Sequence, residues 1–148
     1  MDLYWIILFL HLLGAAIWAG GHLVLSLAIL PRALKADDPA LLQGYAMGYM
    51  RIAMPALVLQ AITGLWLALQ VVPDWRDWLS FSDPQTTGTG VKLVLLAVTL
   101  GLIVSRRLSG HAHHGPEALN GMAWHLRAMT LVAVLFQAAG AFLRTGGL

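Results

Sequence analysis

Two histidines lie inside a long apolar run that contains no acidic or basic residue. The run covers residues 4–30, and the histidines are His11 and His22. In a helix, eleven residues at ~100° each bring both rings to the same face, about 16 Å apart along the axis. An ionisable side chain is costly in hydrocarbon and usually faces the interior of a helix bundle. Because neutral imidazole is a good ligand for metals and haem iron, the spacing predicts an internal histidine-based site.

The composition indicates a membrane protein. The chain has 148 residues, of which 59% are hydrophobic and 11% are charged, against about 25% charged in soluble domains. The length fits one bundle without a second domain. There is no cysteine, which excludes thiolate metal sites, disulfides and c-type haem attachment. The net charge of +2 comes from basic residues between apolar spans, where topology explains them, so no nucleic-acid partner is expected.

Four apolar spans predict an all-α fold, an integral membrane four-helix bundle forming a single domain over residues 1–148. Pro31 and Pro73 close the first two spans, and Arg106 with Arg107 closes the third. The first span is expected to be retained, since no basic segment precedes it as in a signal peptide. A short interfacial helix is expected near residues 75–81. The predicted spans are residues 4–30, 51–72, 90–105 and 118–143.

The charges between the spans predict the orientation. Basic residues concentrate before the second span and after the third, whereas the middle connection is mainly acidic. Because basic loops stay in the cytoplasm, both termini are expected on the periplasmic side of a bacterial inner membrane. The residues behind this inference are Arg32, Lys35, Arg51, Arg106 and Arg107 on the basic side, and Asp74, Asp77 and Asp83, with Arg76, on the other.

Depth along the spans sorts the polar side chains into two layers. At ~1.5 Å per residue, Lys92 reaches about the depth of His11 in an outer layer. His125 reaches about the depth of His22 in an inner layer. Three methionines fall within a turn or two of that inner layer, namely Met54, Met122 and Met129.

The inner layer suits two kinds of cofactor. Two opposed imidazoles from different helices hold b-type haem in many bundles, whereas imidazole with thioether is also acceptable to copper. For haem, the predicted ligands are His22 and His125, with His11 binding a second haem in the outer layer. Lys92 is the predicted catalytic residue, as a ligand, a propionate partner or a proton relay. Trp18 would stack on the cofactor, Arg51 would pair with a propionate, and Met54 would join the histidines in binding copper.

Each of these residues also has a purely structural interpretation. His11 would hydrogen-bond a neighbouring carbonyl, His125 would lie at the interface, and Lys92 would extend to the outer surface. The methionines and Trp18 would fill the core. His111, His113 and His114 form a metal-like string, but a solvated loop explains them better.

Four segments carry a family resemblance. They are LHLLGAAIWAGGHLVLSLAILPRAL (10–34), YMRIAMPALVLQAITGLWLAL (49–69), TGTGVKLVLLAVTLGL (87–102) and AWHLRAMTLVAVLFQAAGAFLRTGGL (123–148). Together they resemble the short, free-standing branch of the copper-resistance protein D (CopD) family. This resemblance implies copper handling and covers nearly the whole chain.

His11 and Lys92 also resemble the first-helix histidine and third-helix lysine of the HemJ-type protoporphyrinogen oxidases. The resemblance implies a role for these two residues in haem binding and activity. His22 and His125 do not belong to the oxidase pattern.

Three functions are therefore expected, in descending order. The first is b-type haem binding for electron transfer, with a quinol or a small oxidant as redox partner. The second is copper binding for transport or resistance, and the third is a HemJ-like oxidase. A homodimer in the lipid bilayer is expected in each case.

Overall fold

The protein is an all-helical bundle in the part of the chain that the structure describes. The computed structural model describes residues 2–109 and 116–145. Neither range contains a strand. The elements are α1 (Leu3–Val24), the π-helical segment η1 (Leu25–Ile29), α2 (Leu30–Ala36), α3 (Pro39–Val71), the 3-10 helix η2 (Trp75–Leu79), α4 (Pro84–Ser109) and α5 (Pro116–Thr145).

Four helices are long and apolar enough to cross a membrane, which supports the predicted membrane bundle. They cover Leu3–Ala36, Pro39–Val71, Pro84–Leu108 and Leu119–Phe142. Large apolar side chains remain exposed along all four. Examples are Phe9, Ile62, Val94 and Leu131. Such a surface suits contact with acyl chains, because the helices satisfy their own main-chain polar groups.

The second helix begins twelve residues before the predicted second span, at Pro39 instead of near Arg51. Asp38 caps it, since its carboxylate accepts from the main-chain N–H groups of Ala40 (2.9 Å) and Leu41 (3.3 Å). Proline suits the first turn, where the missing N–H would be unpaired in any case. Arg51 therefore lies within α3 and not in a loop.

The third long helix also begins early, at Pro84 instead of near Gly90. The Asp83 carboxylate accepts from the N–H groups of Gln85 and Thr86, while the Thr86 hydroxyl accepts from the Asp83 N–H. This reciprocal pair is a capping box. The Thr86 N–H, followed by weaker bonds from Gln85 and Ser82, holds the pKa of the Asp83 carboxyl below its ordinary value.

The first helix continues past Pro31 instead of ending there. Proline lacks the N–H that would bond four residues back, so an α-helix normally kinks or breaks at this position. Here the preceding turn widens into η1, and the Leu30 N–H bonds to the Leu25 carbonyl five residues back. The helix then continues as α2 to Ala36.

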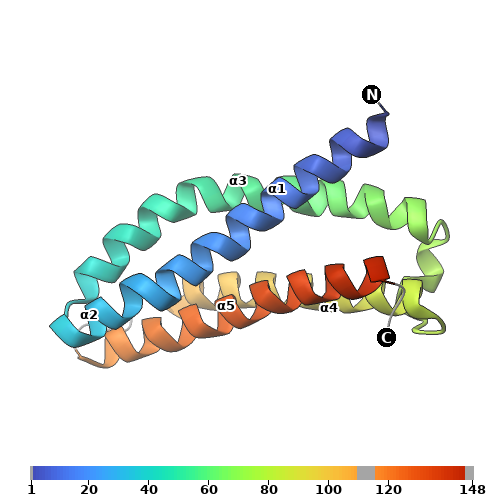
Figure 1. Ribbon diagram of the computed structural model, residues 1–148. Helices are drawn as coiled ribbons and strands as arrows, with labels where there is room; N and C mark the ends of the chain where they lie inside the picture. The colour runs from blue at the N-terminus through green and yellow to red at the C-terminus, as the bar shows by residue number, and fades with distance from the viewer. Residues whose placement is uncertain (1, 110–115, 146–148) are drawn as a thin grey trace.

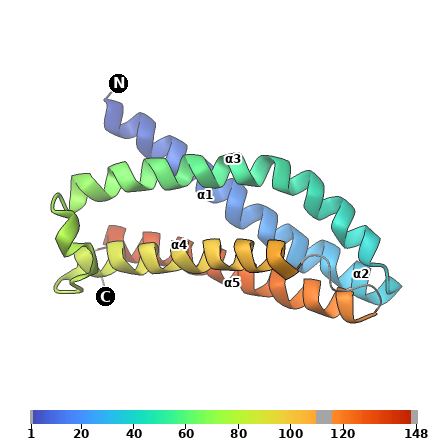
Figure 2. The same cartoon turned by 180° about the vertical axis from the view of Figure 1, so that it is seen from behind.

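The helices are arranged around α1, which packs against both α3 and α5, while α4 packs against α5. Figures 1 and 2 show α1 crossing α3, so that its first turns rise away from α4 and α5. The first turn of α1 and the last turn of α5 lie towards the end that carries η2, here called the η2 end. The opposite end carries α2 and the start of α3, and is here called the α2 end.

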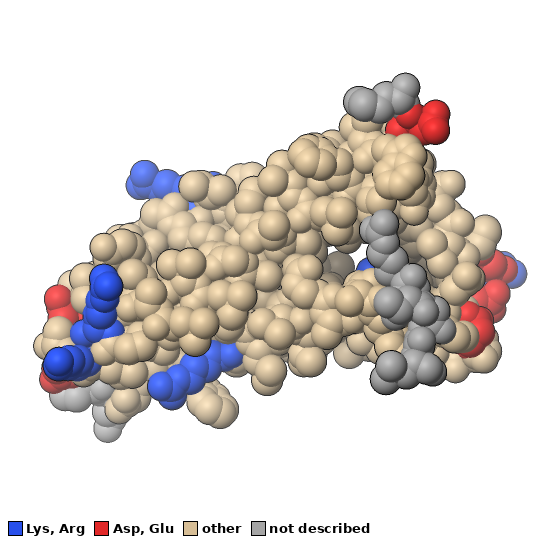
Figure 3. Space-filling view, in the orientation of Figure 1, with Lys and Arg blue, Asp and Glu red and all other residues tan. Residues whose placement is uncertain are grey.

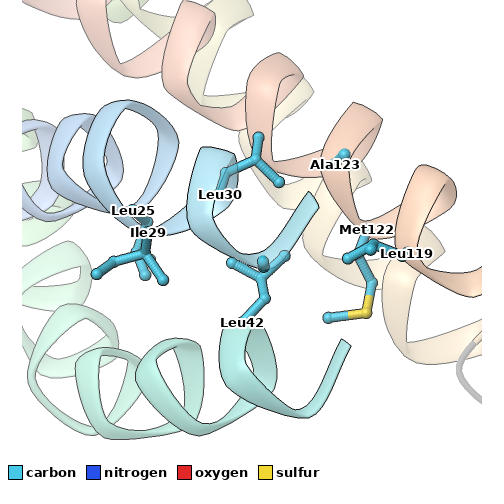
Figure 4. Close-up of a cluster of buried hydrophobic side chains, with 8 residues drawn as sticks. Leu25, Ile29, Leu30, Leu42, Leu119, Met122 and Ala123 are labelled. Atoms are coloured by element: carbon cyan, nitrogen blue, oxygen red, sulfur yellow. The ribbon is translucent and has the colours of Figure 1, made fainter. Parts of the chain in front are cut away.

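Two apolar clusters fill the interior. The cluster at the α2 end joins side chains from η1, α2, α3 and α5, as Figure 4 shows for most of its members. The second cluster lies nearer the middle of the bundle and surrounds Trp18. The buried members of the first are Leu25, Ile29, Leu30, Ala33, Leu42, Leu119, Met122 and Ala123, and those of the second are Trp18, Ala19, Ala53, Leu57, Met129 and Ala133.

Charge is distributed unevenly between the two ends. Figure 3 shows most of the visible basic side chains towards the α2 end, beside a smaller acidic group. The η2 end is mainly acidic. Its capping residues Asp74 and Asp83 bind main-chain N–H groups of η2 and α4. The spans between the ends hold few charges.

Candidate functional sites

The first candidate site surrounds His22 and consists of Trp18, His22, Tyr49 and His125. The His22 side chain is buried, at 3% exposed. Its Nδ1 lies 2.8 Å from the Trp18 carbonyl oxygen and 3.0 Å from the Tyr49 hydroxyl. A carbonyl oxygen only accepts hydrogen bonds, so Nδ1 carries the hydrogen. In the neutral ring Nε2 then has a free lone pair, and this is the usual ligating arrangement of histidine.

Two aromatic rings contact His22. The Trp18 and His22 ring centroids are 4.5 Å apart, and Tyr49 meets His22 edge-on at 5.3 Å. Trp18 is 2% exposed and belongs to the central cluster. It packs directly on His22, as its predicted position on the same helix face requires.

His125 is included in the candidate site because of its predicted depth on α5. It is half-buried, and no hydrogen bond or ring contact joins it to His22 within the described part of the chain. The Thr130 hydroxyl, further along α5, lies 3.2 Å from the His22 carbonyl oxygen and 2.6 Å from the Ser26 hydroxyl. These contacts tie α5 to α1 beside the two imidazoles.

The second candidate site surrounds His11 and consists of His11, Gln60, Thr63, Gly64 and Lys92. His11 Nδ1 lies 3.1 Å from both the Gln60 carbonyl oxygen and the Thr63 hydroxyl. The Thr63 hydroxyl donates its hydrogen to main-chain carbonyls of its own helix, so it accepts from His11. Nδ1 is therefore protonated here too, and the neutral ring leaves its Nε2 lone pair free.

Gly64 makes room for the His11 ring, because an added Cβ there would lie 2.8 Å from Cε1 of His11. The side-chain oxygen of Gln60, one turn before Gly64, is buried without a hydrogen-bond partner among the described residues. An unpaired buried amide oxygen costs free energy. The His11 site therefore retains one unsatisfied acceptor.

Lys92 approaches His11 from α4. It is half-buried, and the two side chains are close enough to interact electrostatically. A Cβ added at Gly140 of α5 would lie 3.9 Å from the Lys92 ammonium nitrogen. Near Lys92 along α4, an apolar pocket lies between α4 and α5 and is lined by residues such as Val91, Leu95 and Leu135.

The remaining predicted site residues lie elsewhere. Arg51 is exposed on α3. Met54 is half-buried and outside both clusters, whereas Met122 and Met129 are core residues. Met122 accepts a weak hydrogen bond from Gln43. His111, His113 and His114 fall outside the described residues. Within the described ranges, no three histidine, aspartate or glutamate side chains form a group that could hold a metal.

Sequence reasoning missed the contribution of α3 to the His22 site. Tyr49 reaches His22 across Gly21, where an added Cβ would overlap the Tyr49 ring. Gly21 beside His22 indicated that another helix could approach closely, but the sequence did not show which helix it was. Gln137 of α5 was also missed. It donates to the Ala15 carbonyl at 3.1 Å.

Comparison with known proteins found no matching family model, and no curated protein or solved structure of significant similarity. The fold and the two sites therefore define a class of protein only. This class is a four-helix bundle of membrane-spanning length with two imidazole sites in its interior.

Proposed function

We propose that the protein binds b-type haem inside a membrane bundle and transfers electrons. The proposal rests on one observation above all, the state of the two imidazoles. Each gives its Nδ1–H to a main-chain carbonyl oxygen, of Trp18 for His22 and of Gln60 for His11. Each therefore offers Nε2 as a lone-pair donor in the interior of the bundle.

The donors at the His22 site suit a haem iron. His22 and His125 come from different helices and supply two imidazoles, which is the number that axial ligation requires. Bound haem would supply one-electron chemistry between its ferric and ferrous states. Trp18 would restrict the His22 ring by packing, and the apolar cluster around it would exclude water.

The second site would serve the same function nearer the η2 end. His11 would be the ligand there, and Lys92 would supply a positive charge for a carboxylate or a proton. An apolar pocket between α4 and α5, lined by residues such as Val91, Leu95 and Leu135, would give a quinol or a small oxidant a place to approach. Arg51, which is exposed on α3, would pair with a propionate at the edge of the haem.

The charge distribution supports an orientation. The basic α2 end would face the cytoplasm by the positive-inside rule. Both termini and η2 would then face the periplasm of a bacterial inner membrane. We also propose that the chain is a short member of the CopD family, on the resemblance of its four apolar segments, and that it forms a homodimer.

An absorption spectrum of the detergent-purified protein tests the proposal. Cells supplied with a haem precursor should yield red protein with a low-spin Soret spectrum and haem by pyridine extraction. His22→Ala and His125→Ala should each abolish that low-spin signal. Trp124→Ala is the matched control, because Trp124 adjoins His125 but is 73% exposed.

The other outcomes separate the alternatives. Copper without porphyrin in the purified protein would overturn haem binding in favour of copper handling. A spectrum lost in His11→Ala and Lys92→Ala but kept in His22→Ala would favour a HemJ-like oxidase. Protein that takes up neither haem nor copper would overturn the assignment of both sites.

A further inference from the structure

The Tyr49 hydroxyl occupies a defined place in the hydrogen bonding around His22. It lies 2.7 Å from the Trp18 carbonyl oxygen and 3.0 Å from His22 Nδ1. A hydroxyl has one hydrogen, and a carbonyl can only accept. The Tyr49 hydrogen therefore goes to a main-chain carbonyl of α1, that of Trp18 at 2.7 Å or, at the longer distance of 3.4 Å, that of Ile17. The Tyr49 oxygen accepts from His22 Nδ1–H.

This bond fixes the His22 ring from a second helix. The Trp18 carbonyl lies four residues back on the helix of His22 itself and anchors Nδ1 locally. Tyr49 comes from α3, and its ring stands at 89° to the imidazole. The single Nδ1–H is shared between acceptors on two helices, and this second attachment restricts ring rotation more than one acceptor does, and so restricts the direction in which Nε2 points.

Gly21 is what permits this approach. A Cβ at Gly21 would overlap the Tyr49 ring, whereas one at the neighbouring Gly20 would meet nothing within 4 Å. An aromatic ring cannot yield by a small side-chain rotation in the way that a flexible chain end can. Two adjacent glycines on one helix therefore differ in function, since only Gly21 admits the tyrosine.

We propose that Tyr49 is a positioning residue for His22, which it holds through the space that Gly21 leaves, so that Nε2 is presented to the bound haem. The inference builds on the proposed haem function, and it adds a residue from a third helix to that site. Partners of this kind commonly change metal affinity by about 10- to 100-fold.

Tyr49→Phe is the first test, because it removes one oxygen and keeps the ring. Titration of the haem-free protein with haemin should show affinity about tenfold weaker than wild type. Tyr45→Phe is the matched control, since Tyr45 lies one turn earlier on α3 and is 53% exposed. It should leave the affinity within about twofold. Equal affinities for wild type and Tyr49→Phe would overturn the proposal.

Gly21→Ala is an independent variant that displaces the tyrosine without altering it. It should weaken haemin binding to a similar extent, while Gly20→Ala should not. In the double variant with Tyr49→Phe, the two losses should not add, because both act through the same bond. Full additivity would mean that Gly21 and Tyr49 act separately, which contradicts the proposal.

A third measurement needs no haem and separates this inference from the proposed function. In haem-free protein carrying 15N-labelled histidine, the His22 Nδ1–H proton should exchange with water at least about tenfold faster in Tyr49→Phe, as expected when one of two acceptors is lost. If wild type binds no haem but this change occurs, the haem function fails and the role of Tyr49 stands. If the exchange rate is unchanged, the positioning role is wrong whether or not haem binds.

Discussion

His22 and His11 lie on one helix and face the same interior, yet their surroundings differ. His22 is enclosed by two aromatic rings and an apolar cluster, and it is 3% exposed. His11 is only half-buried, and a lysine and an unpaired glutamine oxygen lie nearby. The hydrogen bond to Nδ1 is of the same kind in both, so the difference lies in packing.

The comparison shows that two histidines with the same hydrogen bonding at Nδ1 can differ in how closely their surroundings pack. Close packing fixes an imidazole at the cost of adaptability, whereas an open, polar surrounding accepts a ligand that enters and leaves. We therefore expect a cofactor at the His22 site to displace part of this packing when it binds, because the ring is 3% exposed, and then to stay resident. We expect the His11 site to meet the exchangeable partner.

The largest expected effect is at the His22 site. Trp18→Ala removes a fully packed ring from the central cluster and should lower the free energy of unfolding by about 3 kcal/mol. Denaturation of the protein in detergent micelles measures this. Trp124→Ala, which removes an exposed ring, should stay within about 0.5 kcal/mol of wild type. Similar losses in both variants would mean that the His22 site is not the rigid one.

At the His11 site the opposite sign is expected. Lys92→Met replaces a half-buried amine in an apolar setting and should raise the free energy of unfolding by about 1 kcal/mol. Lys35→Met is the control, since Lys35 is exposed at the α2 end. A lower stability for Lys92→Met would show that the amine makes a stabilising bond. The His11 site would then resemble the His22 site in how firmly its side chains are held.

A smaller difference is expected between two glycines of α3. Gly48→Ala meets open space and should stabilise the helix by about 0.5–1 kcal/mol. Gly64→Ala should lose that gain, because its Cβ displaces the His11 ring. Because the half-buried His11 ring can move aside, the difference between the two variants should not exceed about 1 kcal/mol. A larger penalty would indicate that His11 is held as firmly as His22.

The smallest effect concerns the start of α4, outside the spans. Hydrogen bonds to the Asp83 carboxylate lower its pKa in the folded protein from the ordinary 3.8. The contribution of the Asp83 carboxylate to stability is therefore complete at pH values above this ordinary pKa, and it is lost as the pH falls through the folded-state pKa. Melting temperatures between pH 7 and pH 3 should fall less for Asp83→Asn, because asparagine caps a helix without titrating. An identical fall in both proteins would exclude this residue as the cause.

Hydropathy sufficed to predict four membrane-length helices, because apolar runs such as residues 4–30 leave few alternatives. It misplaced the helix starts at Pro39 and Pro84, since capping by Asp38 and Asp83 is local and polar. The same-face relation of His11 and His22 followed from helix geometry. The contacts of Tyr49 with His22 and of Gln60 with His11 could not be predicted in this way, because they depend on which helices adjoin and how closely those helices approach.

The π-helical segment Leu25–Ile29 has a consequence for how length changes are tolerated. A wide turn of this kind contains one residue more than an α-helix needs over the same rise. Removing one residue there would restore ordinary winding and leave Leu30–Ala36 facing the same way relative to His22, whereas a deletion in the plain α-helix on either side would rotate the two parts of the helix by about 100° against each other. Leu30 and Ala33 would keep their places in the apolar cluster at the α2 end. The chain should therefore tolerate a single-codon deletion within Leu25–Ile29 better than one a turn earlier or later.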